Sequence, residues 1–205
     1  MASPLTRPTG RRGFSLLFAV LALGLLAADG RPAARVRAAA ERIRQSDYPA
    51  AIKLLTPLAD SSAAAAVSAA AEARLMLGYS QYHLHNYEAA AAACTQSAAQ
   101  THRLQTYALY YAGISELARR DWAGACADLA RIFPLSPPAS LLPRAYYGLA
   151  RCQVELGQTA AAVQALDALA KLPGASDEWQ PHLLLFRARA LDHMGSPNLA
   201  GPLLR

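Results

Sequence analysis

Side chains that could do chemistry are few in this chain and do not gather into a catalytic motif. The sequence has five histidines, three cysteines and 14 carboxylates among 205 residues. It contains no GxSxG, HExxH or GxxxxGK(S/T) segment, the spacings that build a nucleophile, a zinc site or a phosphate cradle. His83 and His85 are two positions apart, so on a helix they point in different directions, and no carboxylate lies at helical spacing to complete a metal site. We therefore predict no catalytic residue, no metal site and no cofactor.

The three cysteines, Cys94, Cys126 and Cys152, leave two interpretations open. Their spacings of 32 and 26 residues match no zinc-binding pattern. All three are expected on helices among apolar neighbours, where a cysteine packs as a small apolar side chain. Cys126 and Cys152 are expected on adjoining helices, so in an oxidising compartment they could instead form a disulfide.

A recurring pattern of small and large residues sets the elements that would position any functional side chain. Its clearest copy consists of Gly113, Trp122, Ala125 and Leu129. In a helical hairpin, the glycine lets the second helix approach closely, Ala125 faces it, Trp122 fills the wedge near the turn and Leu129 lies on the same buried face as Ala125. The same intervals recur from Ala39, Gly78, Ala150 and Ala188, and successive copies start 39, 35, 37 and 38 residues apart. The loops therefore vary in length while the hairpin stays constant.

This pattern resembles the tetratricopeptide repeat, over roughly residues 32–205. The resemblance implies an all-α protein, a right-handed superhelical solenoid of about 4.5 antiparallel helix hairpins. The last copy stops before a complete second helix. We therefore expect either that a partner covers this end or that the chain is part of a longer protein.

The resemblance also implies a binding surface, because in tetratricopeptide arrays the first helix of each hairpin lines a concave groove. Carried over position by position, the predicted partner-binding groove consists of Leu75, Tyr79, His83, Tyr107, Tyr110, Ile114, Arg144, Tyr147, Arg151, His182 and Arg189. Tyrosine and arginine are the side chains that often carry binding energy. The Lys/Asn clamp with which some members of the family bind chaperone tails is not reproduced, since Leu75 and Tyr79 occupy two of its positions. A cytosolic co-chaperone function is therefore not expected, and the expected ligand is a protein or peptide that binds without this clamp.

The first 30 residues differ in composition from the rest of the chain. Residues 1–12 are polar and basic, whereas residues 14–28 are apolar and uncharged. As a helix, this run would span about 22 Å, less than the roughly 30 Å hydrocarbon core of a membrane. With the small residues Ala28 and Gly30 after it, the segment is typical of a signal peptide. We predict a signal peptide over residues 1–30, a repeat domain over residues 31–205 and export to the bacterial periplasm, with an uncleaved inner-membrane anchor facing the periplasm as the alternative.

The net charge of +6 does not indicate a nucleic-acid partner. Arg7, Arg11 and Arg12 lie in the predicted signal peptide, and the sequence after residue 28 has 17 basic and 14 acidic residues. Such a small excess, spread along the chain, is unlike the concentrated positive charge of nucleic-acid-binding proteins. A membrane contact is expected only through residues 14–28, if they are not cleaved.

The most specific function that the sequence supports is a non-enzymatic scaffold in the cell envelope. A second resemblance offers an alternative: residues 107–113 and 134–150 are similar to the helical amino-terminal region of some soluble lytic murein transglycosylases. That resemblance implies work near peptidoglycan, but the catalytic Glu-Ser motif of this family is missing, since Ser115-Glu116 has the reverse order. A further alternative is an assembly factor anchored in the inner membrane. The partner could belong to the peptidoglycan machinery in any of these cases.

Overall fold

The computed structural model describes residues 31–60, 67–100, 104–173, 179, 181 and 184–189. Within these ranges the chain is helical and contains no strand. The helices are α2 (Arg31–Arg44), α3 (Tyr48–Ala59), α4 (Val67–His83), α5 (Tyr87–Gln100), α6 (Gln105–Arg119), α7 (Trp122–Ala130), the short 3-10 helix η2 (Phe133–Leu135), α8 (Leu142–Glu155) and α9 (Thr159–Ala170). None of the helices in the described part is both long and apolar enough to cross a membrane. The predicted signal peptide and the last partial second helix lie outside the described residues.

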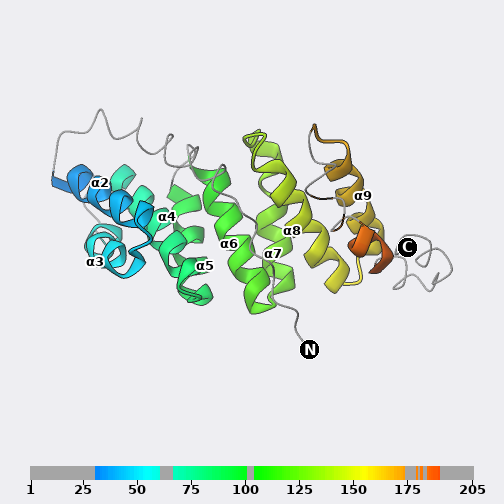
Figure 1. Cartoon of the computed structure of the whole chain (residues 1–205), viewed down its shortest axis with the longest axis horizontal. Helices are drawn as coiled ribbons and strands as arrows, with labels where there is room; N and C mark the ends of the chain where they lie inside the picture. Colours follow the sequence, from blue (N-terminus) through cyan, green and yellow to red (C-terminus); the bar gives the residue numbers. More distant parts are fainter. Residues whose placement is uncertain are drawn as a thin grey trace.

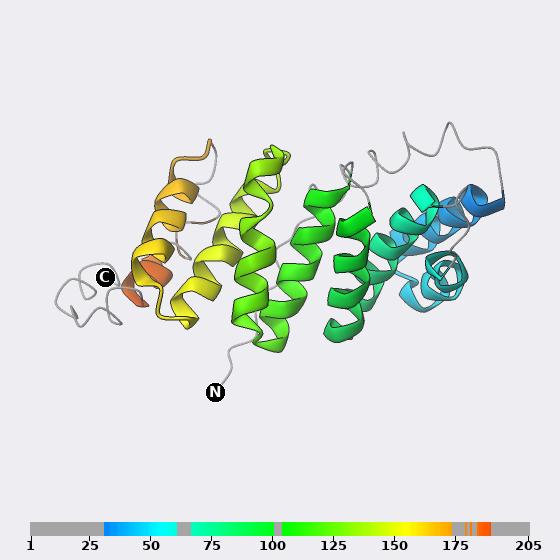
Figure 2. The ribbon, with the colours of Figure 1, turned by 180° about the vertical axis from the view of Figure 1, so that it is seen from behind.

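Four hairpins, α2/α3, α4/α5, α6/α7 and α8/α9, follow one another along the long axis of the molecule (Figure 1). Seen from behind, the same order is preserved, with each hairpin beside the next (Figure 2). Successive first helices are in contact, α2 with α4, α4 with α6 and α6 with α8, whereas successive second helices share at most isolated contacts within the described residues. The first helices therefore form the inner layer of the array and the second helices the outer layer. This arrangement confirms the predicted all-α solenoid.

The turn inside each hairpin has the same form four times. Ser46, His85, Arg120 and Gly157 have positive φ angles of 61°, 63°, 62° and 70°. These four residues are separated by 39, 35 and 37 positions, the intervals of the sequence pattern. The residue after this position directly precedes the second helix, and in two hairpins it is an aspartate whose carboxylate accepts a hydrogen bond from the backbone, Asp47 from Ala50 N and Asp121 from Gly124 N. Asp47 and Asp121 thus cap the second helices of their hairpins.

Close contact within the hairpins depends on glycines of the first helices. A Cβ atom at Gly78 would lie 2.3 Å from Cys94 Sγ and 2.9 Å from the carbonyl oxygen of Ala90, and a Cβ at Gly113 would lie 2.6 Å from Leu129 Cγ. The predicted role of these glycines is confirmed. In the α6/α7 hairpin, however, the side chain nearest Gly113 is Leu129, although Ala125 is also fully buried. The larger side chain reaches further across the interface and fills the hollow.

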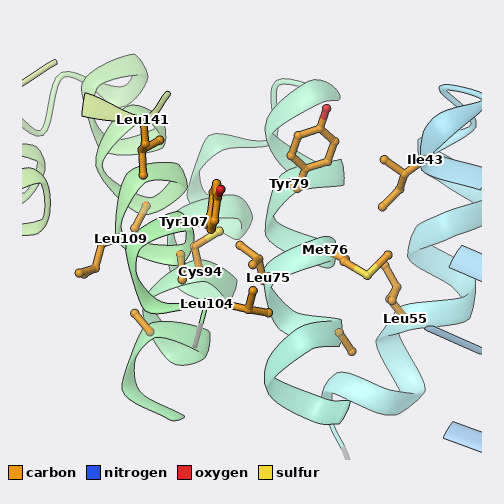
Figure 3. Packing of buried hydrophobic residues seen from close by; sticks show 14 of the residues in the cluster. Ile43, Leu55, Leu75, Met76, Tyr79, Cys94, Leu104, Tyr107, Leu109 and Leu141 are labelled. Carbon is orange, nitrogen blue, oxygen red and sulfur yellow. The ribbon is translucent and has the colours of Figure 1, made fainter. Parts of the chain in front are cut away.

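The hydrophobic core continues from one hairpin to the next. One cluster extends from α2 to α8, and its centre between α4, α5 and α6 is shown in Figure 3. A second cluster joins α8, α9 and the helical residues 184–189 through Phe186. Leu149 of α8 packs against both clusters. The core is therefore continuous along the described array, as expected for a solenoid in which each repeat buries its apolar face against its neighbours.

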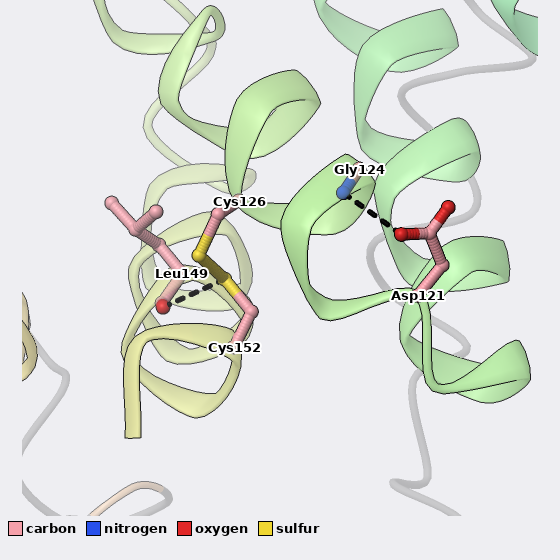
Figure 4. The surroundings of a disulfide bond; sticks show 5 residues. All are labelled: Asp121, Gly124, Cys126, Leu149 and Cys152. Carbon is pink, nitrogen blue, oxygen red and sulfur yellow. Dashed lines mark hydrogen bonds between the residues drawn. A yellow bond between two sulfur atoms is a disulfide. The ribbon is translucent and has the colours of Figure 1, made fainter. Parts of the chain in front are cut away.

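A disulfide joins Cys126 of α7 to Cys152 of α8, with 5.7 Å between the two Cα atoms (Figure 4). This Cα separation lies within the usual range for disulfides. The sulfur of Cys152 also lies 3.0 Å from the carbonyl oxygen of Leu149. Of the two interpretations that the sequence left open for these cysteines, the structure therefore has the disulfide, whereas Cys94 is a buried free thiol. The bond links the second helix of one hairpin to the first helix of the next.

Candidate partner-binding surface

Three residues of the predicted groove are core residues. Leu75, Tyr79 and Tyr107 are only 0%, 2% and 8% exposed, and all three belong to the main hydrophobic cluster (Figure 3). Their prediction as groove-lining residues is therefore wrong. The reason is that the first helices approach one another closely, so that large neighbouring side chains cover these positions.

The remaining described residues of the predicted groove are accessible to different degrees. Half-buried positions are His83, Tyr110, Ile114, Arg144, Tyr147 and Arg151, and Arg189 is exposed. His182 lies outside the described residues. Tyr82 of α4, which the sequence analysis did not include, is also half-buried and contacts His83 and Tyr111. Its position three residues after Tyr79 was the signal that could have identified it. We give the name first-helix face to six of the half-buried positions on α4, α6 and α8: Tyr82, Tyr110, Ile114, Arg144, Tyr147 and Arg151.

Aromatic rings connect α4 with its neighbours on this side of the array. The rings of His83 and Tyr48 are stacked, with centroids 4.9 Å apart, and the centroid of Tyr79 lies 4.4 Å from that of His83. Tyr111 of α6 meets Tyr79 edge-on at 5.0 Å and Tyr110 at 5.2 Å. Offset and edge-to-face pairs of this kind stabilise packing beyond the area they bury. The cluster therefore holds the side chains at the surface in fixed positions.

The aromatic cluster is uncharged at neutral pH. Burial, assisted by the nearby His85, lowers the pKa of His83 to about 4, so its imidazole is neutral. Burial also raises the pKa of Tyr82, and it raises that of Tyr110 to about 12. The tyrosine hydroxyls therefore keep their protons and can donate hydrogen bonds to a partner.

Two arginines of α8 place positive charge near these tyrosines. The guanidinium of Arg144 opposes the burial-driven rise in the pKa of Tyr110, and that of Arg151 does the same for Tyr82 and Tyr147. Neither Arg144 nor Arg151 forms an ion pair with a carboxylate of the described residues. Arg189 lies over the ring of Phe186, 5.5 Å from its centroid. The structure thus brings together arginines and tyrosines that the sequence pattern had placed on three separate helices.

One carboxylate, Glu116 of α6, has the raised pKa that catalytic acids often show. Burial, followed by the negative charges of Asp128 and Asp121, raises the pKa of Glu116 to about 7. Its Oε2 atom is buried without a hydrogen-bond partner in the described structure. Both neighbouring aspartates have structural contacts, since Asp121 caps α7 and Asp128 pairs with Arg131 at 3.0 Å. No group of three or more potential metal ligands occurs among the described residues. We therefore interpret Glu116 as a structural carboxyl that is partly buried between α6 and α7.

Glu116→Gln should stabilise the protein at alkaline pH. In the folded protein the pKa of Glu116 is about 7, against 4.5 without its surroundings. Below pH 4.5 the carboxyl is neutral in the folded and unfolded states, and its burial costs no stability through charge. As the pH rises through 7, the folded protein has to bury a charged carboxylate, and the free energy of unfolding falls. The shift corresponds to at most about 3 kcal/mol, which solvent screening at this half-buried site reduces to about 1 kcal/mol. Urea unfolding should show the variant about 1 kcal/mol more stable than the parent at pH 8 and unchanged at pH 4.

Glu88→Gln, at an exposed position of α5, provides the matched control and should show no such difference between the two pH values. An equal effect of Glu116→Gln at pH 4 and pH 8 would contradict the prediction, because a neutral glutamine would then change packing rather than remove a charge.

Comparisons with known proteins agree with this architecture. A family model described as tetratricopeptide repeat matches residues 107–136 and 144–174, which are the hairpins α6/α7 and α8/α9. The solved structure described as MamA AMB-1 is similar with a TM-score of 0.69 and 15% sequence identity, over 86% of this chain and 90% of that chain. At this identity the likeness shows the fold alone. No curated protein matches the chain significantly. From its repeats and its architecture, the chain is a tetratricopeptide-repeat-like protein.

Proposed function

We propose that this protein is a non-enzymatic scaffold in the bacterial periplasm that binds a protein partner on its first-helix face. Tetratricopeptide repeats and the helical solenoid support a role in protein interaction. This fold typically serves as a scaffold rather than as a catalyst. The proposal adds the compartment and the surface to that general role.

The observation that carries the proposal is the composition of the first-helix face. Tyr110 and Tyr147 supply large side chains with few rotatable bonds, and Arg151 supplies a planar guanidinium. All three are half-buried, so they are held by neighbours but still reach solvent. Such side chains lose little conformational freedom when a partner binds.

Export is supported by two independent features. Residues 1–30 have the composition of a signal peptide. The disulfide between Cys126 and Cys152 is of a kind that persists in oxidising compartments such as the periplasm and is rare in the cytosol.

A site-specific photo-crosslinker tests the surface and the compartment together. Placed at Ile114, on the first-helix face, it should give a discrete protein adduct when cells producing the full chain are irradiated. Placed at Ala127, an exposed residue of α7 in the outer layer, it should give none. An immunoblot of fractionated cells should find the Ile114 adduct in the periplasmic fraction. Adducts of equal yield at both positions, or none at Ile114, would contradict the proposed surface, and a cytosolic adduct would contradict export.

A further inference from the structure

A single stripe of α8 carries two arginines with a tyrosine between them. Arg144, Tyr147 and Arg151 are three and four residues apart, and residues at these intervals lie on the same side of a helix. All three side chains are half-buried. The separation of seven positions between Arg144 and Arg151 corresponds to about 10.5 Å along the helix axis.

The charge of this stripe is not neutralised within the described structure. Glu41, Asp47, Asp128 and Asp167 each form an ion pair with an arginine other than Arg144 and Arg151. Glu155 lies one helical turn after Arg151, an arrangement that often gives an ion pair, but here it forms none. Two positive charges on one side of α8 thus have no carboxylate ion-pair partner among the described residues.

Tyrosine side chains lie within electrostatic range of both guanidinium groups. Arg144 is close enough to Tyr110 and Tyr111 to oppose the rise in their pKa values, and Arg151 acts in the same way on Tyr82 and Tyr147. Tyr147 is itself packed against Phe186, with ring centroids 5.3 Å apart. Arg144 and Arg151 are also half-buried, which limits their conformational freedom, and a guanidinium can bind a carboxylate through two parallel N–H donors.

The distance between the two arginines along α8 matches the spacing of side chains in an extended peptide. In an extended polyproline II segment, residues i and i+3 lie on the same side and are about 9.3 Å apart, close to the roughly 10.5 Å rise between the arginines. We propose that the partner enters as an extended acidic peptide whose carboxylates at positions i and i+3 bind Arg144 and Arg151. Tyr147 lies between the two carboxylate positions and contacts the intervening residues. This inference rests on the proposed scaffold function and adds the chemistry of its partner.

Fluorescence anisotropy with labelled synthetic peptides tests this chemistry on the purified chain with its disulfide intact. The first probe is a proline-rich peptide with glutamates at i and i+3. The other probes have glutamine at both positions, or glutamates at i and i+1. The first peptide should bind at least tenfold more tightly than the glutamine peptide, and more tightly than the i, i+1 peptide, because only it reaches both arginines at once.

Arg144→Gln with Arg151→Gln should weaken binding of the first peptide by about 30-fold. Arg35→Gln with Lys53→Gln changes the net charge equally at exposed positions of α2 and α3 and should leave the affinity within about twofold. Circular dichroism checks that both variants remain folded. Equal loss in the two double variants, or equal binding of the i, i+3 and i, i+1 peptides, would overturn the proposal, because either result indicates attraction without a defined site.

Crosslinking at Ile114 distinguishes a failure of this inference from a failure of the proposed function. If the adduct at Ile114 forms equally well with Arg144→Gln and Arg151→Gln in place, the protein binds a partner on this face but not through paired carboxylates. The inference of an acidic peptide would then be wrong, whereas the proposed function would stand. If no adduct forms in either background, the proposed function fails first.

Discussion

Replacing Gly78 by alanine is expected to lower the free energy of unfolding by about 2–3 kcal/mol. The new Cβ would lie 2.3 Å from Cys94 Sγ and 2.9 Å from the carbonyl oxygen of Ala90. A sulfur can turn away, but the Ala90 oxygen belongs to the backbone of α5, so α4 and α5 must move apart. The better helix propensity of alanine, about 1 kcal/mol, offsets only part of this cost. Urea unfolding monitored by circular dichroism measures the difference.

A second substitution separates the two contacts of Gly78. Cys94→Ala removes the sulfur but leaves the Ala90 carbonyl in place, so combining it with Gly78→Ala should recover only part of the lost stability. The coupling between the two changes follows from a double-mutant cycle. A Gly78→Ala variant more stable than the parent would show that helix propensity dominates and that α4 and α5 are not in close contact at this position.

Leu129→Ala is expected to be still more destabilising, by about 4 kcal/mol. Leu129 is fully buried in α7, and its side chain fills the hollows left by glycines on two successive first helices, Gly113 of α6 and Gly148 of α8. Truncation removes the buried methyl groups and leaves a cavity between two hairpins, which relaxes only partly. The free energy of unfolding, measured with the disulfide oxidised in parent and variant, gives the effect.

Two controls accompany the Leu129 substitution. Leu135→Ala removes the same atoms from a side chain that is 39% exposed and should cost less than about 1 kcal/mol. Gly113→Ala places a methyl group into the space that Leu129→Ala vacates, so the double variant should be more stable than Leu129→Ala alone. A cost for Leu129→Ala no larger than that for Leu135→Ala would mean that Leu129 does not fill the space between the hairpins.

The repeat architecture could be predicted from the sequence because its signal is local. A helix–turn–helix needs a small residue, a turn and a matching buried position at fixed intervals, and these intervals lie within about 20 residues of one another. The pattern therefore located Gly78, Gly113 and their partners without knowledge of the neighbouring hairpins. The turns at Ser46, His85 and Arg120 confirm it through their backbone conformation, although none of them is the glycine that most readily adopts positive φ.

The binding surface could be predicted only in part, because it depends on how closely the hairpins stack. Sequence intervals assign a residue to one side of a helix, but Leu75 and Tyr79 are buried by the approach of neighbouring first helices, which no local interval encodes. Tyr82 was missed although it lies only three residues after Tyr79 and is half-buried. The pairing of Cys126 with Cys152 also required the distance between two hairpins. The predicted arginines of α8, Arg144 and Arg151, are half-buried and remain candidates for the surface.

The position of the disulfide has a consequence for how the array comes apart. In a solenoid, each repeat is stabilised mainly by its immediate neighbours, so terminal repeats can fray while the rest stays folded. The bond between Cys126 and Cys152 lies across the boundary between the hairpins α6/α7 and α8/α9. Loss of the last hairpin therefore cannot release α8 from α7 as a separate segment. These two hairpins, which carry five of the six positions of the first-helix face, are tethered covalently, so the parts of this surface on α6 and α8 stay joined when the ends of the array open.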